Sequence, residues 1–136
     1  MNALPAHYGA VAAGSALGGL ARYLLSVAGY AWWGDSFPWP TLIANLAGSF
    51  LVGLYFALNL PGGRLNDPLG RRVFVTAGFC AGFTTFSLFS LESLLLLQAG
   101  RPAALLAYLV LSVVGWMVAV WFGYEVGRPK RGAAKV

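Results

Sequence analysis

Polar residues that could bind a small ion lie within long apolar stretches of this sequence. Arg22 lies in the first stretch, Asn45 in the second, and the segment Thr-Thr-Phe-Ser at 84–87 in the third. Polar and ionisable groups are costly inside a membrane, so each is by default a candidate for ion binding or transport. No nucleophile–base pair, metal-ligand cluster or phosphate-binding loop is visible in the sequence. These residues therefore indicate ion binding or transport, and an enzyme is not expected.

The third stretch has the most unusual composition. Gly78 and Gly82 flank a short apolar run, and the hydroxyls of Thr84, Thr85 and Ser87 follow. Glycine inside a helix costs about 1 kcal/mol relative to alanine. A helix broken near the middle of the membrane would expose backbone carbonyls to a cation, as it does in transporters. The alternative is a continuous helix in which the two glycines form a close-packing face.

Four phenylalanines recur at intervals of three or four residues in the same stretch, at Phe79, Phe83, Phe86 and Phe89. Taken alone, this spacing indicates a packing stripe on a helix. The alternative uses the positive edge of an aromatic ring, which can face an anion. Such weak sites would suit a pore, because an ion held by full charges is released too slowly.

The other intramembrane polar residues each have two interpretations. Arg22 could extend its charge to the interface or attract anions into a wet vestibule. Asn45 could bond a neighbouring helix or offer its amide N–H groups to a pore. Tyr108 and Ser112 are four residues apart and share a helix face, which could line a polar track or bond another helix. Glu92 is expected to be paired or to lie near the interface.

The elements that must position these residues are four apolar stretches of the length that a membrane-spanning helix needs, about 20 residues. Strand alternation is absent, and a lipid-facing backbone must satisfy its own hydrogen bonds, so helices are expected. A cleaved signal peptide is disfavoured for the first stretch, because no Lys or Arg precedes it. The sequence predicts one all-α integral membrane domain over 1–136, with four transmembrane helices and a basic tail at 127–136. The helices are expected at about 8–28, 41–60, 73–97 and 103–126.

The composition supports a membrane protein and excludes most soluble enzymes. Of the 136 residues, 59% are hydrophobic and 10% are charged, whereas soluble domains carry about 25% charged residues. Cys80 is the single cysteine, so an internal disulfide and a cysteine-rich metal site are excluded. A nucleic-acid partner for the basic tail is not expected, because a few cations beside a span are usual at the cytoplasmic membrane surface.

The cations are distributed unevenly about the four predicted helices. An even number of spans places both termini and the second loop on one side, which holds seven cations, and the other side holds Arg101. Positive-inside counting places the termini in the cytoplasm, as a multi-pass protein of the cell (inner) membrane. The seven cations are Arg64, Arg71, Arg72, Arg128, Lys130, Arg131 and Lys135.

Three segments resemble the CrcB/Fluc fluoride channels. They are Gly-Gly-Leu-Ala-Arg-Tyr at 18–23, Thr-Leu-Ile-Ala-Asn-Leu-Ala-Gly-Ser-Phe at 41–50, and the Gly-rich and Thr-Thr-Phe-Ser-Leu-Phe segment at 78–89. Their order and spacing agree with the family, and the resemblance covers all four predicted helices. It implies a fluoride-selective channel that exports fluoride passively, built from four-helix subunits that pair antiparallel in the lipid membrane and enclose two pores.

The resemblance also implies a structural Na⁺ at the dimer centre, held by backbone carbonyls where the third helix breaks. In this sequence those carbonyls belong to Ala81 and Thr84. Ala81 replaces the usual glycine, which a carbonyl ligand tolerates, and Leu88 replaces the usual threonine. Arg22 corresponds to a basic residue of the first helix, at the vestibule. The implied fluoride-pore residues are Asn45, Phe86, Phe89, Thr85, Ser87, Tyr108 and Ser112.

Two questions about assembly and class stay open in the sequence. Four short helices do not easily enclose their own polar residues, so a dimer is expected. The antiparallel homodimer stays the expectation, although it needs a chain that inserts both ways and a ratio of seven cations to one favours a single orientation. An oppositely oriented paralogue is the alternative partner. The alternative functions are a small multidrug-type transporter, which usually needs an acidic residue in its first helix, and a membrane subunit without transport.

Overall fold

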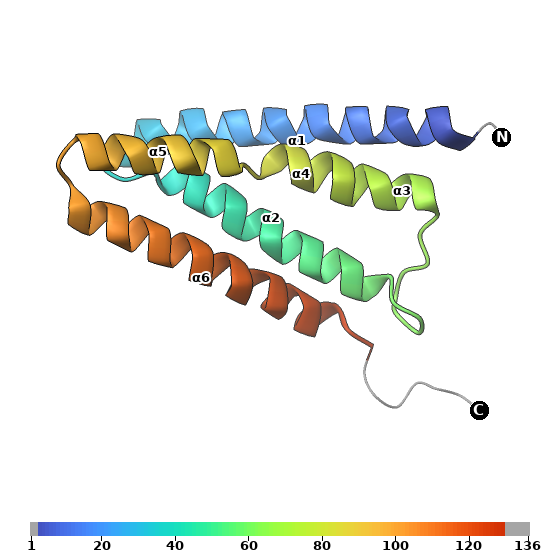
Figure 1. The fold of residues 1–136 in the computed structure, drawn as a ribbon. Coiled ribbons are helices and arrows are strands. Elements are labelled where there is room, and N and C mark those ends of the chain that lie inside the picture. The colour runs from blue at the N-terminus through green and yellow to red at the C-terminus, as the bar shows by residue number, and fades with distance from the viewer. Residues whose placement is uncertain (1–2, 130–136) are drawn as a thin grey trace.

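The structure is a computed structural model that describes residues 3–129, with side chains described from His7 onward. Lys130, Arg131 and Lys135 of the predicted basic tail lie outside the described residues. Every regular element within the described part is helical (Figure 1). The elements are α1 (Ala3–Trp33), α2 (Trp39–Leu58), α3 (Leu69–Val73), the π-helical segment η1 (Phe74–Cys80), α4 (Ala81–Phe83), α5 (Phe86–Gln98) and α6 (Pro102–Gly127).

Four helical stretches are long and apolar enough to cross a membrane, which confirms the predicted number. They are His7–Trp33, Trp39–Leu58, Leu69–Gln98 and Pro102–Gly127. Their limits differ from the predicted ones mainly at the end of the first helix and at the start of the third stretch, which begins at Leu69. The first helix continues through the aromatic residues to Trp33, and α2 begins two residues early because proline is tolerated in a first helical turn, here at Pro40.

Glycines in the left-handed conformation end two of the long helices. Gly34 has φ +69° after α1, and its N–H donates to the carbonyl of Tyr30 at 3.0 Å. Gly100 has φ +66° after α5, and the N–H of Arg101 donates to the carbonyl of Leu96 at 3.0 Å. A side chain with a Cβ is disfavoured in this conformation, so glycine lets the chain reverse at the end of each helix.

The helices form two packed pairs, and the interrupted third stretch belongs to one of them (Figure 1). α2 packs along α6, and α1 packs along η1 and α4. Glycines permit both close approaches. A Cβ on Gly78 would lie 2.9 Å from the Cα of Gly14, and a Cβ on Gly123 would lie 2.9 Å from the backbone N of Leu54. Small residues at these positions let backbones meet, as is typical of helices packed in membranes.

The buried core lies where α2, α5 and α6 meet. Its members are Leu42, Phe89, Leu96 and Tyr108, and Trp116 is among the partly buried residues packed against them. Large apolar side chains cover much of the outer surface, including Leu17 on α1 and Trp121 on α6. A water-soluble monomer rarely exposes so large an apolar surface. The chain is therefore a multi-pass membrane protein.

The loop between α2 and α3 is held by one buried carboxylate, that of Asp67. The Tyr55 hydroxyl donates to Asp67 at 2.7 Å, and the Arg71 guanidinium donates to its other oxygen at 2.7 Å. Arg72 Nε donates to the Asp67 carbonyl at 2.8 Å. The hydrogen bond from Tyr55, together with the charges of the two arginines, holds the pKa of Asp67 below its usual value.

Candidate ion pathway

The helical path of the third stretch is interrupted at Thr84 and Thr85. α4 ends at Phe83, Thr84 has φ −84° and ψ 159°, and Thr85 has φ −154° and ψ 125°, so both residues are extended. Helical geometry resumes at Phe86. The Thr84 N–H and hydroxyl both donate to the carbonyl of Cys80, at 3.0 and 2.9 Å. The interruption therefore has defined backbone partners on its N-terminal side.

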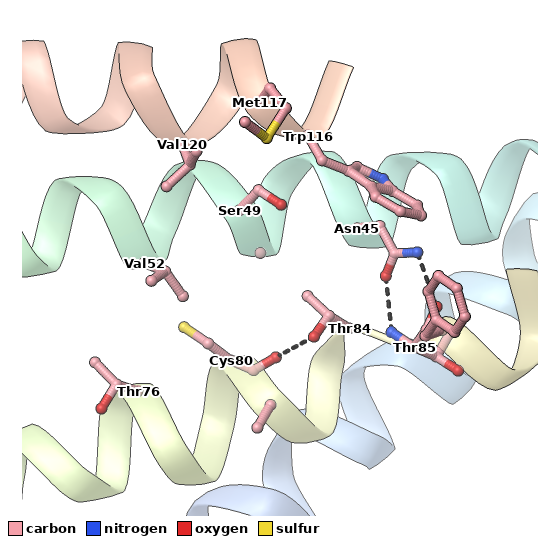
Figure 2. A pocket seen from close by; sticks show the side chains of 13 residues that line it. Asn45, Ser49, Val52, Thr76, Cys80, Thr84, Thr85, Trp116, Met117 and Val120 are labelled. Atoms are coloured by element: carbon pink, nitrogen blue, oxygen red, sulfur yellow. Dashed lines mark hydrogen bonds between the residues drawn. The ribbon is translucent and has the colours of Figure 1, made fainter. Parts of the chain in front are cut away.

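Asn45 of α2 bonds to this interruption with both ends of its amide. Its Nδ2 donates to the carbonyl of Thr85 at 2.9 Å, and its Oδ1 accepts from the Thr85 N–H at 2.7 Å (Figure 2). Asn45 is only 4% exposed. A buried polar backbone group needs a partner, and these two bonds supply one for each polar group of an extended residue. Of the two interpretations of Asn45, the bond to a neighbouring segment is therefore present.

The pairing of Thr85 with Asn45 changes the hydrogen bonds of the preceding turn. In a continuous α-helix the Thr85 N–H would donate to the carbonyl of Ala81, and the Phe86 N–H to that of Gly82. Here the Thr85 N–H is taken by Asn45, and the Gly82 carbonyl accepts from Arg22 Nε at 3.3 Å. The cationic side chain of Arg22 thus lies at the C-terminal end of α4, where the helix dipole is negative.

The hydroxyl of Thr85, at the end of the interruption, caps α5. The Thr85 hydroxyl accepts from the backbone N–H of Leu88 at 3.2 Å and lies 3.1 Å from the Ser87 hydroxyl. This is an N-cap arrangement, in which a threonine oxygen satisfies a free N–H of the first helical turn. The Leu88 side chain supplies no hydroxyl, but its backbone N–H takes part in the cap.

A cavity of about 510 Å³ lies beside the interruption, between α2, η1, α4 and α6. It brings together five of the predicted site residues from two segments of the sequence, as Figure 2 shows for those it labels. These five are Asn45, Ala81, Thr84, Thr85 and Phe86. Trp116 and Met117 of α6 also line the cavity, and neither was predicted. A large side chain on an apolar helix carries no sequence signal of such a role.

The remaining predicted residues lie outside the cavity lining. Phe86 and Phe89 are neighbours, with ring centroids 5.4 Å apart, yet Phe86 is 69% exposed and Phe89 is 6% exposed. Phe89 in turn contacts Tyr108, whose ring centroid lies 5.2 Å away. Ser112 is fully buried on α6, one turn beyond Tyr108. Phe89 and Tyr108 thus meet at the α5–α6 contact, and Phe89 also contacts Trp116, which lines the cavity.

Glu92 accepts hydrogen bonds from hydroxyls of three different helices. One carboxylate oxygen accepts from Tyr30 of α1 at 2.9 Å and from Thr41 of α2 at 2.8 Å, and the other accepts from Tyr108 of α6 at 2.7 Å. Glu92 itself belongs to α5. The sequence predicted that Glu92 is paired or near the interface, and it is paired. The hydroxyl of Tyr108 is accordingly engaged by the carboxylate.

Replacing Glu92 with leucine is expected to lower the thermal stability of the purified protein. The change leaves the hydroxyls of Tyr30, Thr41 and Tyr108 without their acceptor. Thr41 and Tyr108 are buried, and each buried polar group left unpaired costs about 1–3 kcal/mol. A melting temperature several degrees below that of the wild-type protein, measured in detergent, would agree with this prediction. Glu125→Leu is the control, because Glu125 pairs with the exposed Arg128 at 2.8 Å and should matter little. Equal stability of both variants would contradict the role of Glu92.

The fold and the cavity together define a class: a small multi-pass membrane protein with a polar, interrupted helix beside an apolar-walled cavity. The sequence matches the family model described as CrcB-like protein, Camphor Resistance (CrcB), over residues 9–124. This chain belongs to the CrcB family. The resemblance noted in the sequence is thereby confirmed.

Curated relatives align over most of both chains. The fluoride-specific ion channel FluC 1 of Rhodopseudomonas palustris (strain BisB18) is 49% identical over 119 residues, which cover 88% of this chain and 84% of the relative. The fluoride-specific ion channel FluC of Rhodospirillum rubrum is 47% identical over 116 residues, covering 84% and 88%. That of Hydrogenovibrio crunogenus is 40% identical over 119 residues, covering 88% and 89%.

Proposed function

We propose that this chain is a fluoride-selective channel subunit that lets fluoride leave the cell passively through its (inner) membrane. The observation that carries this proposal is the set of relatives named fluoride-specific ion channels, at 40–49% identity over most of both chains. Fluoride enters cells as its neutral acid and ionises inside. A passive anion path driven by the fluoride gradient and the membrane potential would return it, without a catalytic step.

The chemistry of the cavity suits a weakly held anion. Asn45 has two amide N–H groups, and one of them already donates to Thr85. We propose that the other donates to fluoride, and that the exposed ring of Phe86 presents its positive edge nearby. Neutral donors hold an anion less tightly than a fixed cation would, so the ion can leave again. Arg22 is proposed to raise the local anion concentration from the vestibule side.

We propose that the interruption lies near the middle of the membrane and that its backbone carbonyls hold a structural Na⁺. The hydrogen bonds at the interruption support this. The Thr85 N–H donates to Asn45, whereas in a continuous helix it would donate to the Ala81 carbonyl. Ala81 and Thr84 both line the cavity, and oxygen atoms of this kind suit a hard cation. Replacing Na⁺ with N-methyl-D-glucamine throughout purification and assay should then lower fluoride efflux. Unchanged efflux and stability without Na⁺ would remove the ion from the proposal.

We propose further that two copies pair antiparallel. Phe86 is 69% exposed in the single chain, and a second copy would shield a ring that coordinates an ion. The excess of cations on one side favours a single orientation and hence an oppositely inserted paralogue as the alternative partner. A C-terminal epitope accessible to protease from both faces of membrane vesicles would support the homodimer. Access from one face only would favour the paralogue.

Fluoride efflux from liposomes tests the function. Purified protein in vesicles loaded with KF should release fluoride to an electrode after valinomycin is added, and should release chloride far more slowly. Phe86→Ile should slow the release several-fold, because an edge-on aromatic interaction contributes roughly 1 kcal/mol. Phe56→Ile is the matched control, since Phe56 is 60% exposed on α2 and does not line the cavity. Efflux no faster than from empty vesicles, or equal for chloride, would contradict a fluoride channel.

The two alternative functions make different predictions in the same assay. A multidrug-type transporter usually needs an acidic residue in its first helix, whereas the charged residue of α1 is Arg22 and the sequence has no Asp or Glu at 3–33. A non-transporting subunit predicts that Asn45 and Phe86 are replaceable with effects on packing alone. Efflux by the wild-type protein that both substitutions reduce would exclude that second alternative.

A further inference from the structure

Two buried polar atoms on α6 have no hydrogen-bond partner among the described residues 3–129. They are the hydroxyl oxygen of Ser112 and the indole nitrogen Nε1 of Trp116. Buried polar groups nearly always have a partner, because a donor removed from water and left unpaired is costly. The indole N–H can only donate, and a serine hydroxyl can rotate to donate. Both groups can therefore donate a hydrogen bond to an acceptor that binds beside them.

The two unpaired groups lie on the same face of α6, one helical turn apart. Trp116 is adjacent to Phe89, which belongs to the α5–α6 contact, and Ser112 lies on α6 between Trp116 and Tyr108, which both contact Phe89. The ring of Trp116 meets Phe89 edge to face, with centroids 4.9 Å apart and an interplanar angle of 71°, and Tyr108 contacts Phe89 one turn on the other side of Ser112. The hydroxyl of Tyr108 is engaged by Glu92. Ser112 and Trp116 are thus the free donors along this face.

Trp116 connects this face to the cavity. It lines the cavity together with Asn45, and Figure 2 shows its ring extending from α6 across α2 on the side of Asn45. A donor on Trp116 therefore lies between the Asn45 end of the cavity and the Ser112–Tyr108 region. Among the described residues, the cavity lining includes no Asp, Glu, Lys or Arg. An acceptor that reaches this position must be small, because the atom itself is buried.

We propose that the indole N–H of Trp116, together with the Ser112 hydroxyl, binds the permeating anion between Asn45 and Tyr108. This inference rests on the proposed function and adds Trp116 to the residues that contact the ion. Fluoride is the chemical match, since it is a small, strong hydrogen-bond acceptor and both groups can donate to it. Two neutral donors would replace part of its hydration without trapping it.

Trp116→Phe tests the proposal, because it removes the N–H and keeps an aromatic ring against Phe89. The variant should pass fluoride at least about tenfold more slowly than wild type in the liposome assay, as expected for the loss of a hydrogen bond to a charged group. Trp121→Phe is the matched control: Trp121 lies on the same helix, is exposed, and should leave efflux unchanged. Wild-type efflux by Trp116→Phe would overturn the proposal. If Trp116→Phe does not fold, Trp116→Met, which also lacks a donor, takes its place. Slower efflux by that variant would support the proposal, and wild-type efflux would overturn it.

A fluorescence measurement separates failure of this inference from failure of the channel function. Adding NaF, but not sodium gluconate, should shift or quench tryptophan emission of the wild-type and Trp121→Phe proteins, and the response should be lost in Trp116→Phe. A response that persists without Trp116 would overturn the inference even where efflux is normal. Wild-type protein that conducts no fluoride would instead refute the proposed function, and the emission response would then show on its own whether Trp116 binds the anion.

Discussion

Asn45→Ala is expected to reduce fluoride efflux to the level of empty vesicles and to lower the stability of the protein. The substitution removes the bond from Nδ2 to the Thr85 carbonyl and the bond from the Thr85 N–H to Oδ1. Each backbone group left unpaired costs about 1–3 kcal/mol. The Thr85 N–H would then be free to bond the Ala81 carbonyl and draw the interruption toward a continuous helix. The proposed donor to fluoride is lost with the same side chain.

Asn59→Ala is the control that separates stability from conduction. Asn59 also bonds the backbone with both ends of its amide: Nδ2 donates to the Tyr55 carbonyl at 3.1 Å, and Oδ1 accepts from the Asp67 N–H at 3.0 Å. It lies at the end of α2, away from the cavity. Asn59→Ala should lower the melting temperature about as much as Asn45→Ala does. The folded fraction of the Asn59→Ala protein should conduct fluoride as the wild-type protein does. Normal efflux by Asn45→Ala, or loss of efflux in both variants, would contradict a specific role for Asn45.

Gly53→Leu is expected to prevent correct packing of α2 against α6. A Cβ at Gly53 would collide with the carbonyl oxygen of Val120 and lie 3.1 Å from the backbone N of Tyr124. Because both contacts are backbone atoms, neither can move aside as a flexible side chain could. Overpacking of this kind costs typically 1–3 kcal/mol and sometimes more. Low yield of monodisperse protein and a melting temperature lowered by many degrees, measured in detergent, are the expected results.

Gly19→Leu is the same chemical change at a position that tolerates it. A Cβ on Gly19 would have no neighbouring atom within 4 Å in the part of the chain that the structure describes, and Gly19 lies within α1. Leucine is a better helix former than glycine by nearly 1 kcal/mol, so this variant should be as stable as wild type or more so. If Gly53→Leu and Gly19→Leu melted at the same temperature, the close approach of α2 and α6 would not be required.

Several site residues could be predicted from the sequence because their residue type is unusual in its surroundings. Asn45 and Thr85 are polar residues within apolar stretches, and the structure places them in contact. Glu92 was conspicuous for the same reason, but its partners could not be identified. The hydroxyls of Tyr30, Thr41 and Tyr108 come from three helices and up to 62 residues away.

Trp116 shows where a sequence pattern gives no signal. An aromatic residue in an apolar helix is expected to pack or to face lipid, and Trp121 of the same helix is exposed. Only the rotation of α6 against α2 and α5 decides that Trp116 lines the cavity with its N–H buried and without a partner among residues 3–129. The glycines Gly53 and Gly123 set that packing, because they bring the two backbones together.

The number of long apolar helices and the membrane class were determined by the sequence itself. Both follow from a local property, namely enough consecutive apolar residues to cross a bilayer with every backbone hydrogen bond satisfied inside the segment. The tertiary structure decided how Asn45 pairs with Thr85, which hydroxyls bind Glu92 and which phenylalanine is buried. These features depend on how the helices are rotated and how closely they approach one another. That is settled by contacts between residues far apart in the chain, which local apolar length does not specify.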